Sequence, residues 1–134
     1  MPDILIVEDE ILIAMEMEAV VMDLGYRCAG IADDMTSAMA IAQDKIDIAL
    51  VDVNLSDGAT GPEIGARLAN ECSAEVVFIT ANPSQLGNGI SGTVGALEKP
   101  LDLALLGELL EYLLAVRQGQ PAEPPSRLVI FEPN

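Results

Sequence analysis

Three carboxylates come directly after two apolar runs of the sequence, and carboxylates placed in this way can bind a metal ion. Glu8 and Asp9 follow residues 4–7, and Asp52 follows residues 48–51. Oxygen ligands of this kind suit Mg²⁺, which prefers an octahedral arrangement and keeps positions open for water and phosphate oxygens. Without a cation, like charges close together would repel one another and raise a pKa. The grouping therefore predicts a site for a hard divalent cation.

A hydroxyl and an amine follow two later apolar runs, and both suit a phosphoryl group. Thr80 follows residues 76–79, and Lys99 follows a short run and precedes Pro100. The lysine can place positive charge beside one phosphoryl oxygen, and the threonine hydroxyl can donate a hydrogen bond to another. Asp52 can attack phosphorus, since carboxylates form acyl phosphates. Phosphoryl transfer needs little beyond such positioning and charge neutralisation.

These side chains would meet at one site if the apolar runs are parallel strands of one sheet. Continuous apolar runs, typical of strands buried on both faces, alternate with segments of helical character. We expect strands at 3–8, 27–32, 47–51, 75–79 and 94–98, and helices at 10–24, 35–43, 62–71 and 101–116. The alternation predicts an α/β fold with a doubly wound five-stranded parallel sheet. Ligands bind at the carboxyl ends of strands in such sheets, where the polar residues stand.

Two stretches interrupt this rhythm. Residues 82–92 contain three glycines within six residues, so the fourth helix should be short or disordered. Residues 118–134 contain four prolines and should form an exposed tail, which leaves residues 1–117 as the domain. The tail includes an apolar, β-prone patch at 128–131. This patch could dock on a sheet edge, dock on a partner or belong to the native packing.

The helix expected at 10–24 is apolar on nearly every side. One face should pack on the sheet, and its residues are Ile13, Met17, Val20, Val21 and Leu24. Ile11, Met15 and Met22 point the other way. This second face is either extra core beneath a neighbouring element or an adaptable surface for a partner.

Composition and charge restrict the possible partners. Hydrophobic residues make up 51% of the chain and aromatic residues 3%, which predicts an aliphatic core. A net charge of -16 disfavours contact with nucleic acid and with anionic lipid. The absence of histidine excludes histidine general-base mechanisms and histidine metal sites. A strand begins at once and no apolar run is long enough to span a bilayer, so we expect a cytoplasmic protein.

The sequence resembles the receiver domain of bacterial two-component response regulators over residues 3 to about 116. Four motifs support the resemblance: ILIVEDE at 4–10, VDVNLSDG at 51–58, FITA at 78–81 and EKP at 98–100. It implies a flavodoxin-like (βα)5 fold with strand order 2-1-3-4-5. It also implies that Asp52 accepts a phosphoryl group from a histidine kinase or a phosphotransfer protein.

The resemblance further implies roles for the other site residues. It implies Mg²⁺ held by Glu8 (mainly through water), Asp9, Asp52 and the backbone carbonyl of Asn54. Thr80 and Lys99 become the pair that responds to phosphorylation, and the Lys99–Pro100 peptide is expected to be cis.

The sequence also departs from the usual receiver pattern. Receivers usually carry an aromatic residue three positions before the lysine, and this chain has Ala96 there. Segment 82–92 replaces the usual fourth helix, so the usual surface for dimerisation or output is altered. Ser56 stands where proline is common. These departures are similar to those of a group of stand-alone receivers from alphaproteobacteria. Residues 78–82 of this chain, however, do not match well the characteristic fourth-strand motif of that group.

We therefore expect a stand-alone response regulator without an output domain, monomeric or weakly dimeric. It would act by protein contact with a downstream target, by phosphorelay or as a phosphate sink. It would not be an enzyme beyond its own phosphorylation and dephosphorylation.

Two alternatives belong to other classes. One is an aspartyl-phosphate hydrolase of haloacid dehalogenase type, which needs a second aspartate where this chain has Asn54, and also needs room for a cap. The other is an interaction module that ignores phosphate, although the complete acidic site argues against it.

Overall fold

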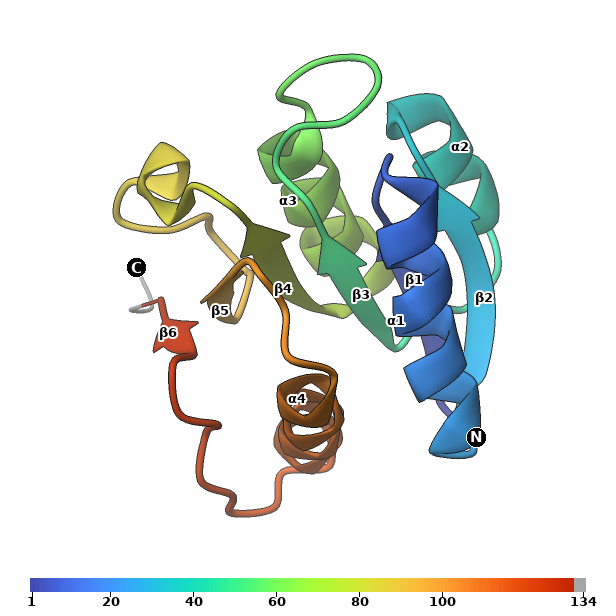
Figure 1. Cartoon of the computed structure of the whole chain (residues 1–134). Coiled ribbons are helices and arrows are strands. Elements are labelled where there is room, and N and C mark those ends of the chain that lie inside the picture. The colour runs from blue at the N-terminus through green and yellow to red at the C-terminus, as the bar shows by residue number, and fades with distance from the viewer. Residues whose placement is uncertain (132–134) are drawn as a thin grey trace.

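The computed structural model describes residues 1–131, and residues 132–134, the end of the expected proline-rich tail, lie outside the described residues. One sheet has the strand order β2-β1-β3-β4-β5-β6 (Figure 1). The strands are β1 (Asp3–Val7), β2 (Arg27–Ala32), β3 (Ile48–Val51), β4 (Glu75–Thr80), β5 (Gly95–Glu98) and β6 (Val129–Ile130). The helices are α1 (Ile11–Asp23), α2 (Met35–Ile41), α3 (Gly61–Cys72), α4 (Leu103–Arg117) and the short 3-10 helix η1 (Pro83–Leu86). The predicted α/β fold with parallel order 2-1-3-4-5 is confirmed.

Helices cover both faces of the sheet, with α1 and α4 on one face and α2 and α3 on the other (Figure 1). Residues of β1 alternate between the two layers. Ile4 and Ile6 pack in the core beneath α1 and α4, whereas Leu5 and Val7 pack in the core beneath α2 and α3. This burial on both faces explains why the strands are continuous apolar runs in the sequence. No helix within residues 1–131 is both long enough and apolar enough to cross a bilayer.

The connection between β4 and β5 contains only η1, so the prediction of a short fourth helix is confirmed. Gly87, Gly89 and Gly92 have φ values of 57°, 114° and 86°. Glycine adopts such backbone conformations without the steric cost that a Cβ would add. These three residues therefore end the helical turn and direct the chain back into β5.

The sheet has one strand more than the sequence predicted. Val129 and Ile130 form β6, which pairs antiparallel with Ala96 and Gly95 of β5. Of the alternatives for the patch at 128–131, the structure selects docking on a sheet edge. A strand of two residues is too short to show an alternating pattern in the sequence. Its formation also depends on an open sheet edge elsewhere in the fold.

Helix α1 presents the two faces that the sequence indicated, with one exception. Met17 and Val21 are buried, but Leu24 lies one residue beyond the helix and is 40% exposed. The other face is not extra core, since its residues remain exposed: Ile11 (59%), Met15 (54%) and Met22 (61%).

Gly65 of α3 provides a test of how closely this helix packs on β4. A Cβ at Gly65 would lie 2.4 Å from Cζ of the buried Phe78. We expect Gly65→Ala to lower the free energy of unfolding by about 1–3 kcal/mol, because the added methyl group overpacks the core. Gly107→Ala in α4 is the matched control, because its nearest neighbour would be 3.9 Å away.

The control should instead raise the free energy of unfolding by about 0.5–1 kcal/mol, since alanine is the better helix former. Denaturant unfolding of the two variants measures both changes. Equal stability changes in the two variants would contradict the close packing of α3.

Candidate functional site

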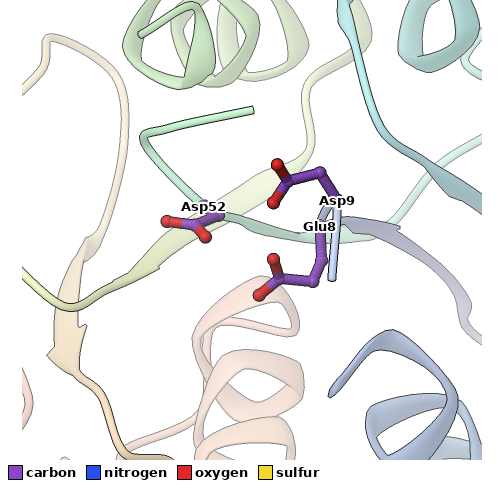
Figure 2. Close-up of side chains that lie close together, drawn as sticks. All are labelled: Glu8, Asp9 and Asp52. Atoms are coloured by element: carbon purple, nitrogen blue, oxygen red, sulfur yellow. The ribbon is translucent and has the colours of Figure 1, made fainter. Parts of the chain in front are cut away.

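Three acidic side chains converge at the carboxyl ends of two neighbouring strands. Glu8 and Asp9 follow β1, and Asp52 follows β3 (Figure 2). One carboxylate oxygen from each residue lies within 4.8 Å of the others. Glu8 and Asp52 are buried, whereas Asp9 is exposed. The backbone N–H of Asp52 donates to the carbonyl of Val7 over 2.9 Å, so sheet pairing places the two strand ends side by side.

Lys99 reaches this acidic group from the end of β5, which is separated from β3 by β4. Its Nζ lies 2.5 Å from Oε1 of Glu8 and 2.8 Å from Oδ2 of Asp52. The backbone N–H of Lys99 donates to the carbonyl of Thr80 over 2.9 Å, which positions the residue at the end of β5. The long side chain then crosses the end of β4 to reach the carboxylates. The side chain is only 13% exposed, so this contact is largely shielded from solvent.

Burial and charge pairing shift two pKa values in this cluster. Burial raises the pKa of Glu8, an effect that its hydrogen bond from Lys99 opposes but does not cancel. Burial alone would lower the pKa of Lys99, but its hydrogen bonds to Asp52 and Glu8 outweigh burial and raise it. The lysine is therefore held firmly in its charged form.

Thr80 and Asn54 complete the group of predicted residues, and both contact the segment after β4. Thr80 is fully buried, and its hydroxyl oxygen accepts the N–H of Asn82 over 3.1 Å. The side-chain amide of Asn54 pairs with that of Gln85, at 3.0 Å and 3.4 Å. Gln85 was not among the residues expected at the site, since nothing in its local sequence indicates a contact 31 positions away.

Gly61 is a second residue that the sequence analysis missed. A Cβ at this first residue of α3 would lie 2.0 Å from the backbone carbonyl oxygen of Asp52. The N–H of Gly61 also donates to the carbonyl of Val53 over 3.0 Å. Glycine therefore lets the start of α3 touch the backbone of the central aspartate. The sequence feature that could have indicated this role is the Gly-Pro pair at the start of the helix.

The charge balance of the cluster fits a divalent cation. Glu8, Asp9 and Asp52 provide three carboxylates, and Lys99 is the one amine that pairs with them among the described residues. Three carboxylates and one amine give the cluster a formal charge of -2, which is three negative charges less one positive charge. Hard oxygen donors with this charge suit Mg²⁺, which takes carboxylate and carbonyl oxygens while retaining water.

Removing the lysine tests how strongly the buried carboxylates depend on it. We expect Lys99→Met to lower the free energy of unfolding by about 3–5 kcal/mol at neutral pH, because Glu8 and Asp52 lose their buried partner. The exposed Lys45, whose side chain is 73% accessible, gives the control Lys45→Met. Lys45 makes one ion pair, to Asp47 at 3.4 Å, and its amine is solvated, so that control should change stability by less than about 1 kcal/mol.

The loss should become smaller in acid. The pKa of Glu8 lies above its usual value, so stability from this group is present below the unfolded pKa of about 4.3 and is lost as pH rises through the folded pKa. Without Lys99 the pKa of Glu8 rises further, and protonation relieves the unpaired charge over a wider pH range. Denaturant unfolding at several pH values measures this trend. A stability loss in Lys99→Met that becomes larger at acidic pH would contradict this expectation.

Comparison with known proteins identifies the family. Residues 4–111 match the family model of the response regulator receiver domain. The chain is 39% identical over 89 residues to the phyllosphere-induced regulator PhyR of Methylorubrum extorquens. That alignment covers 65% of this chain and 33% of the relative, so the chain matches about a third of that protein.

Solved structures agree with this result. The receiver domain of PhyR from Erythrobacter litoralis has a TM-score of 0.72 and 28% identity, covering 93% of this chain and 95% of that domain. A PhyR variant from Bartonella quintana, described as an anti-anti-sigma factor, has a TM-score of 0.76 and 28% identity. It covers 87% of this chain and 50% of the other. The chain belongs to the response regulator receiver domain family, whose members act in two-component signalling.

Proposed function

We propose that Asp52 accepts a phosphoryl group from a histidine kinase or a phosphotransfer protein, and that the modified domain signals by protein contact. The observation that supports this most directly is the position of Asp52. Its carboxylate lies beside two other carboxylates and the amine of Lys99 at the end of the sheet. This combination of a nucleophile, a cation site and a fixed positive charge is what phosphoryl transfer requires.

The chain's own residues prepare the nucleophile. Oδ1 of Asp52 accepts the N–H of Val53 over 2.7 Å, and Oδ2 accepts a hydrogen bond from Lys99. In transfer from phosphohistidine, an Asp52 oxygen forms the bond to phosphorus while the P–N bond breaks and its electrons stay on the imidazole. Lys99 then exchanges a carboxylate for a phosphoryl oxygen. The Thr80 hydroxyl, at the end of the adjacent strand, can donate to another phosphoryl oxygen.

We propose Mg²⁺ as the cofactor of this site. Glu8, Asp9 and Asp52 would hold it, together with the backbone carbonyl of Asn54, and Glu8 would act mainly through water. When bound, the ion neutralises charge on the phosphoryl oxygens and on the carboxylates that surround them. The acidic cluster fits the Mg²⁺ sites of receiver domains in general.

The partners we propose are proteins. A relative from Bartonella is described as an anti-anti-sigma factor, which favours protein contact as the output here. The exposed α1 face of Ile11, Met15 and Met22 lies in the helix that directly follows Glu8 and Asp9, and offers a surface for the kinase. The net charge of -16 argues against nucleic acid and anionic membranes, and we propose a cytoplasmic location. We place the receiver domain at 1–117 and the proline-rich tail at 118–134.

The hydrolase alternative has less support. Its second catalytic aspartate would occupy the position of Asn54, whose amide is neutral and paired with Gln85. Steady turnover of a phosphate monoester by the purified protein would revive it.

Phosphorylation tests the assignment of Asp52. With acetyl phosphate and Mg²⁺, or with a cognate kinase, the wild type should gain one phosphoryl group as seen by intact-protein mass spectrometry. Asp52→Asn should abolish the gain, because an amide does not attack phosphorus. Asp44→Asn, at an exposed position outside the site, is the control and should label normally. Labelling that persists in Asp52→Asn would refute the assignment.

Metal binding can be measured separately from phosphorylation. Because an ion bound only by the folded state stabilises it, Mg²⁺ at one hundred times its dissociation constant should raise the free energy of unfolding by about 2.7 kcal/mol. Asp9→Asn should shift the required Mg²⁺ concentration upward by at least about tenfold, since it removes one of the three clustered carboxylates. Asp44→Asn again serves as the control. A wild-type stability that does not change with Mg²⁺ concentration would contradict the cation site.

A further inference from the structure

The C-terminal strand is held to the domain by few contacts. Val129 and Ile130 pair with β5, and the N–H of Phe131 donates to the carbonyl of Val94 over 3.0 Å. Val129 and Ile130 remain exposed, at 59% and 46%. The partly buried Phe131 packs against the core beneath α2 and α3, whereas Leu128, just before β6, packs against the core beneath α1 and α4. Phe131 is therefore the apolar contact of residues 129–131 with the core that contains Phe78. We call residues 129–131 the clasp.

Two glycines form the seat of the clasp. The Phe131 ring lies against the backbone of Gly89, where a Cβ would come within 2.6 Å of the ring. A Cβ at Gly95 would come within 2.2 Å of the carbonyl oxygen of Val129. The same ring packs against Phe78 of β4, with a centroid distance of 6.4 Å. The clasp thus depends on close approach to both the sheet and the segment between β4 and β5.

The clasp covers core that a full helix would otherwise cover. The segment between β4 and β5 provides only η1 and a glycine-rich turn (Figure 1). Leu86 and Ile90 of this segment, together with Phe131, pack against the core that contains Phe78 and Ala96. The tail therefore supplies apolar cover at the edge of the domain that is next to β5.

The same segment is bonded to the phosphoacceptor site at its other end. The N–H of Asn82 donates to the Thr80 hydroxyl, and Gln85 pairs with Asn54. Residues 82–89 therefore connect the site to the seat of Phe131 by direct contacts. The Thr80 hydroxyl can donate to a phosphoryl oxygen while still accepting from Asn82, but a rotation that moves Oγ1 toward the phosphoryl group stretches the hydrogen bond from Asn82. If the backbone carbonyl of Asn54 turns toward a cation, Asn54 itself moves, and its side-chain hydrogen bond to Gln85 is disturbed.

We propose that the clasp is released when the phosphoacceptor site is occupied, so that the tail reports phosphorylation by uncovering the edge of β5. This inference rests on the proposed function of Asp52. Occupancy loosens residues 82–89, the Gly89 seat moves, and Phe131 loses its packing. Since coupling between two sites is reciprocal, a bound clasp must also lower the affinity of the site for a phosphoryl group by the same factor.

Amide exchange of the clasp tests the first half of the proposal. In full-length protein with Mg²⁺ and beryllofluoride, a phosphoryl mimic, the Phe131 amide should exchange about tenfold faster than with Mg²⁺ alone, within the usual range of coupling. Fluorine NMR of the same sample shows whether beryllofluoride is bound. Bound beryllofluoride with unchanged Phe131 exchange would overturn the clasp proposal alone. Absence of bound beryllofluoride would overturn the proposed function, and the clasp proposal with it.

Affinity for beryllofluoride tests the reciprocal half. Phe131→Ala removes the ring and should tighten binding about tenfold. Val129→Ala keeps the backbone pairing and truncates an exposed side chain, so it should bind as the wild type does. Phe131→Leu keeps apolar bulk and should give an intermediate gain, which keeps the comparison usable if the alanine variant unfolds. Reduced stability with unchanged affinity in the Phe131 variants would mean that the ring only packs, and would overturn the proposal.

Discussion

The ammonium group of Lys99, held between the carboxylates of Glu8 and Asp52, imposes a constraint that the rest of the structure must meet. A buried charge pair is tolerated only when its geometry is good, because desolvation is costly. Here the three residues follow β1, β3 and β5, so the carboxyl ends of these strands must lie near one another. Parallel pairing ends β1 and β3 level with each other, at Val7 and Val51. β5 ends two residues further along, because Phe78 pairs with Val51 and Ala96 whereas Glu98 pairs with Thr80, and the long lysine side chain spans this offset. The fold therefore positions the charges, and the charges in turn require the register.

Much of this arrangement was predictable because strands buried on both faces have a distinctive sequence. The apolar runs before Glu8, Asp52 and Thr80 located three strands, and their polar ends located the site. The second apolar face of α1 was also recognisable in the sequence. Whether that face is buried or exposed was not, since this depends on which elements pack beside the helix. Leu24 was misplaced because helical periodicity does not continue past the end of the helix at Asp23.

The features that could not be predicted all depend on contacts between distant residues. Gln85 pairs with Asn54 only because the shortened connection after β4 brings it over the turn that follows β3. A glycine is needed at position 61 only because α3 begins against the backbone of Asp52, where a Cβ would clash. The β-prone patch at 128–131 was recognised in the sequence, but the choice among its possible placements depends on the open edge that β5 offers. In each case the local sequence permits the feature, and the assembled sheet selects it.

The position of β6 also has a consequence for association between molecules. An uncovered sheet edge presents unpaired N–H and C=O groups, which are a template for pairing with another chain. β6 occupies the outer edge of β5, and its own two-residue length leaves little edge beyond it. The tail therefore protects β5 against edge-to-edge aggregation, and a chain without this pairing would expose the β5 edge to pairing with another molecule.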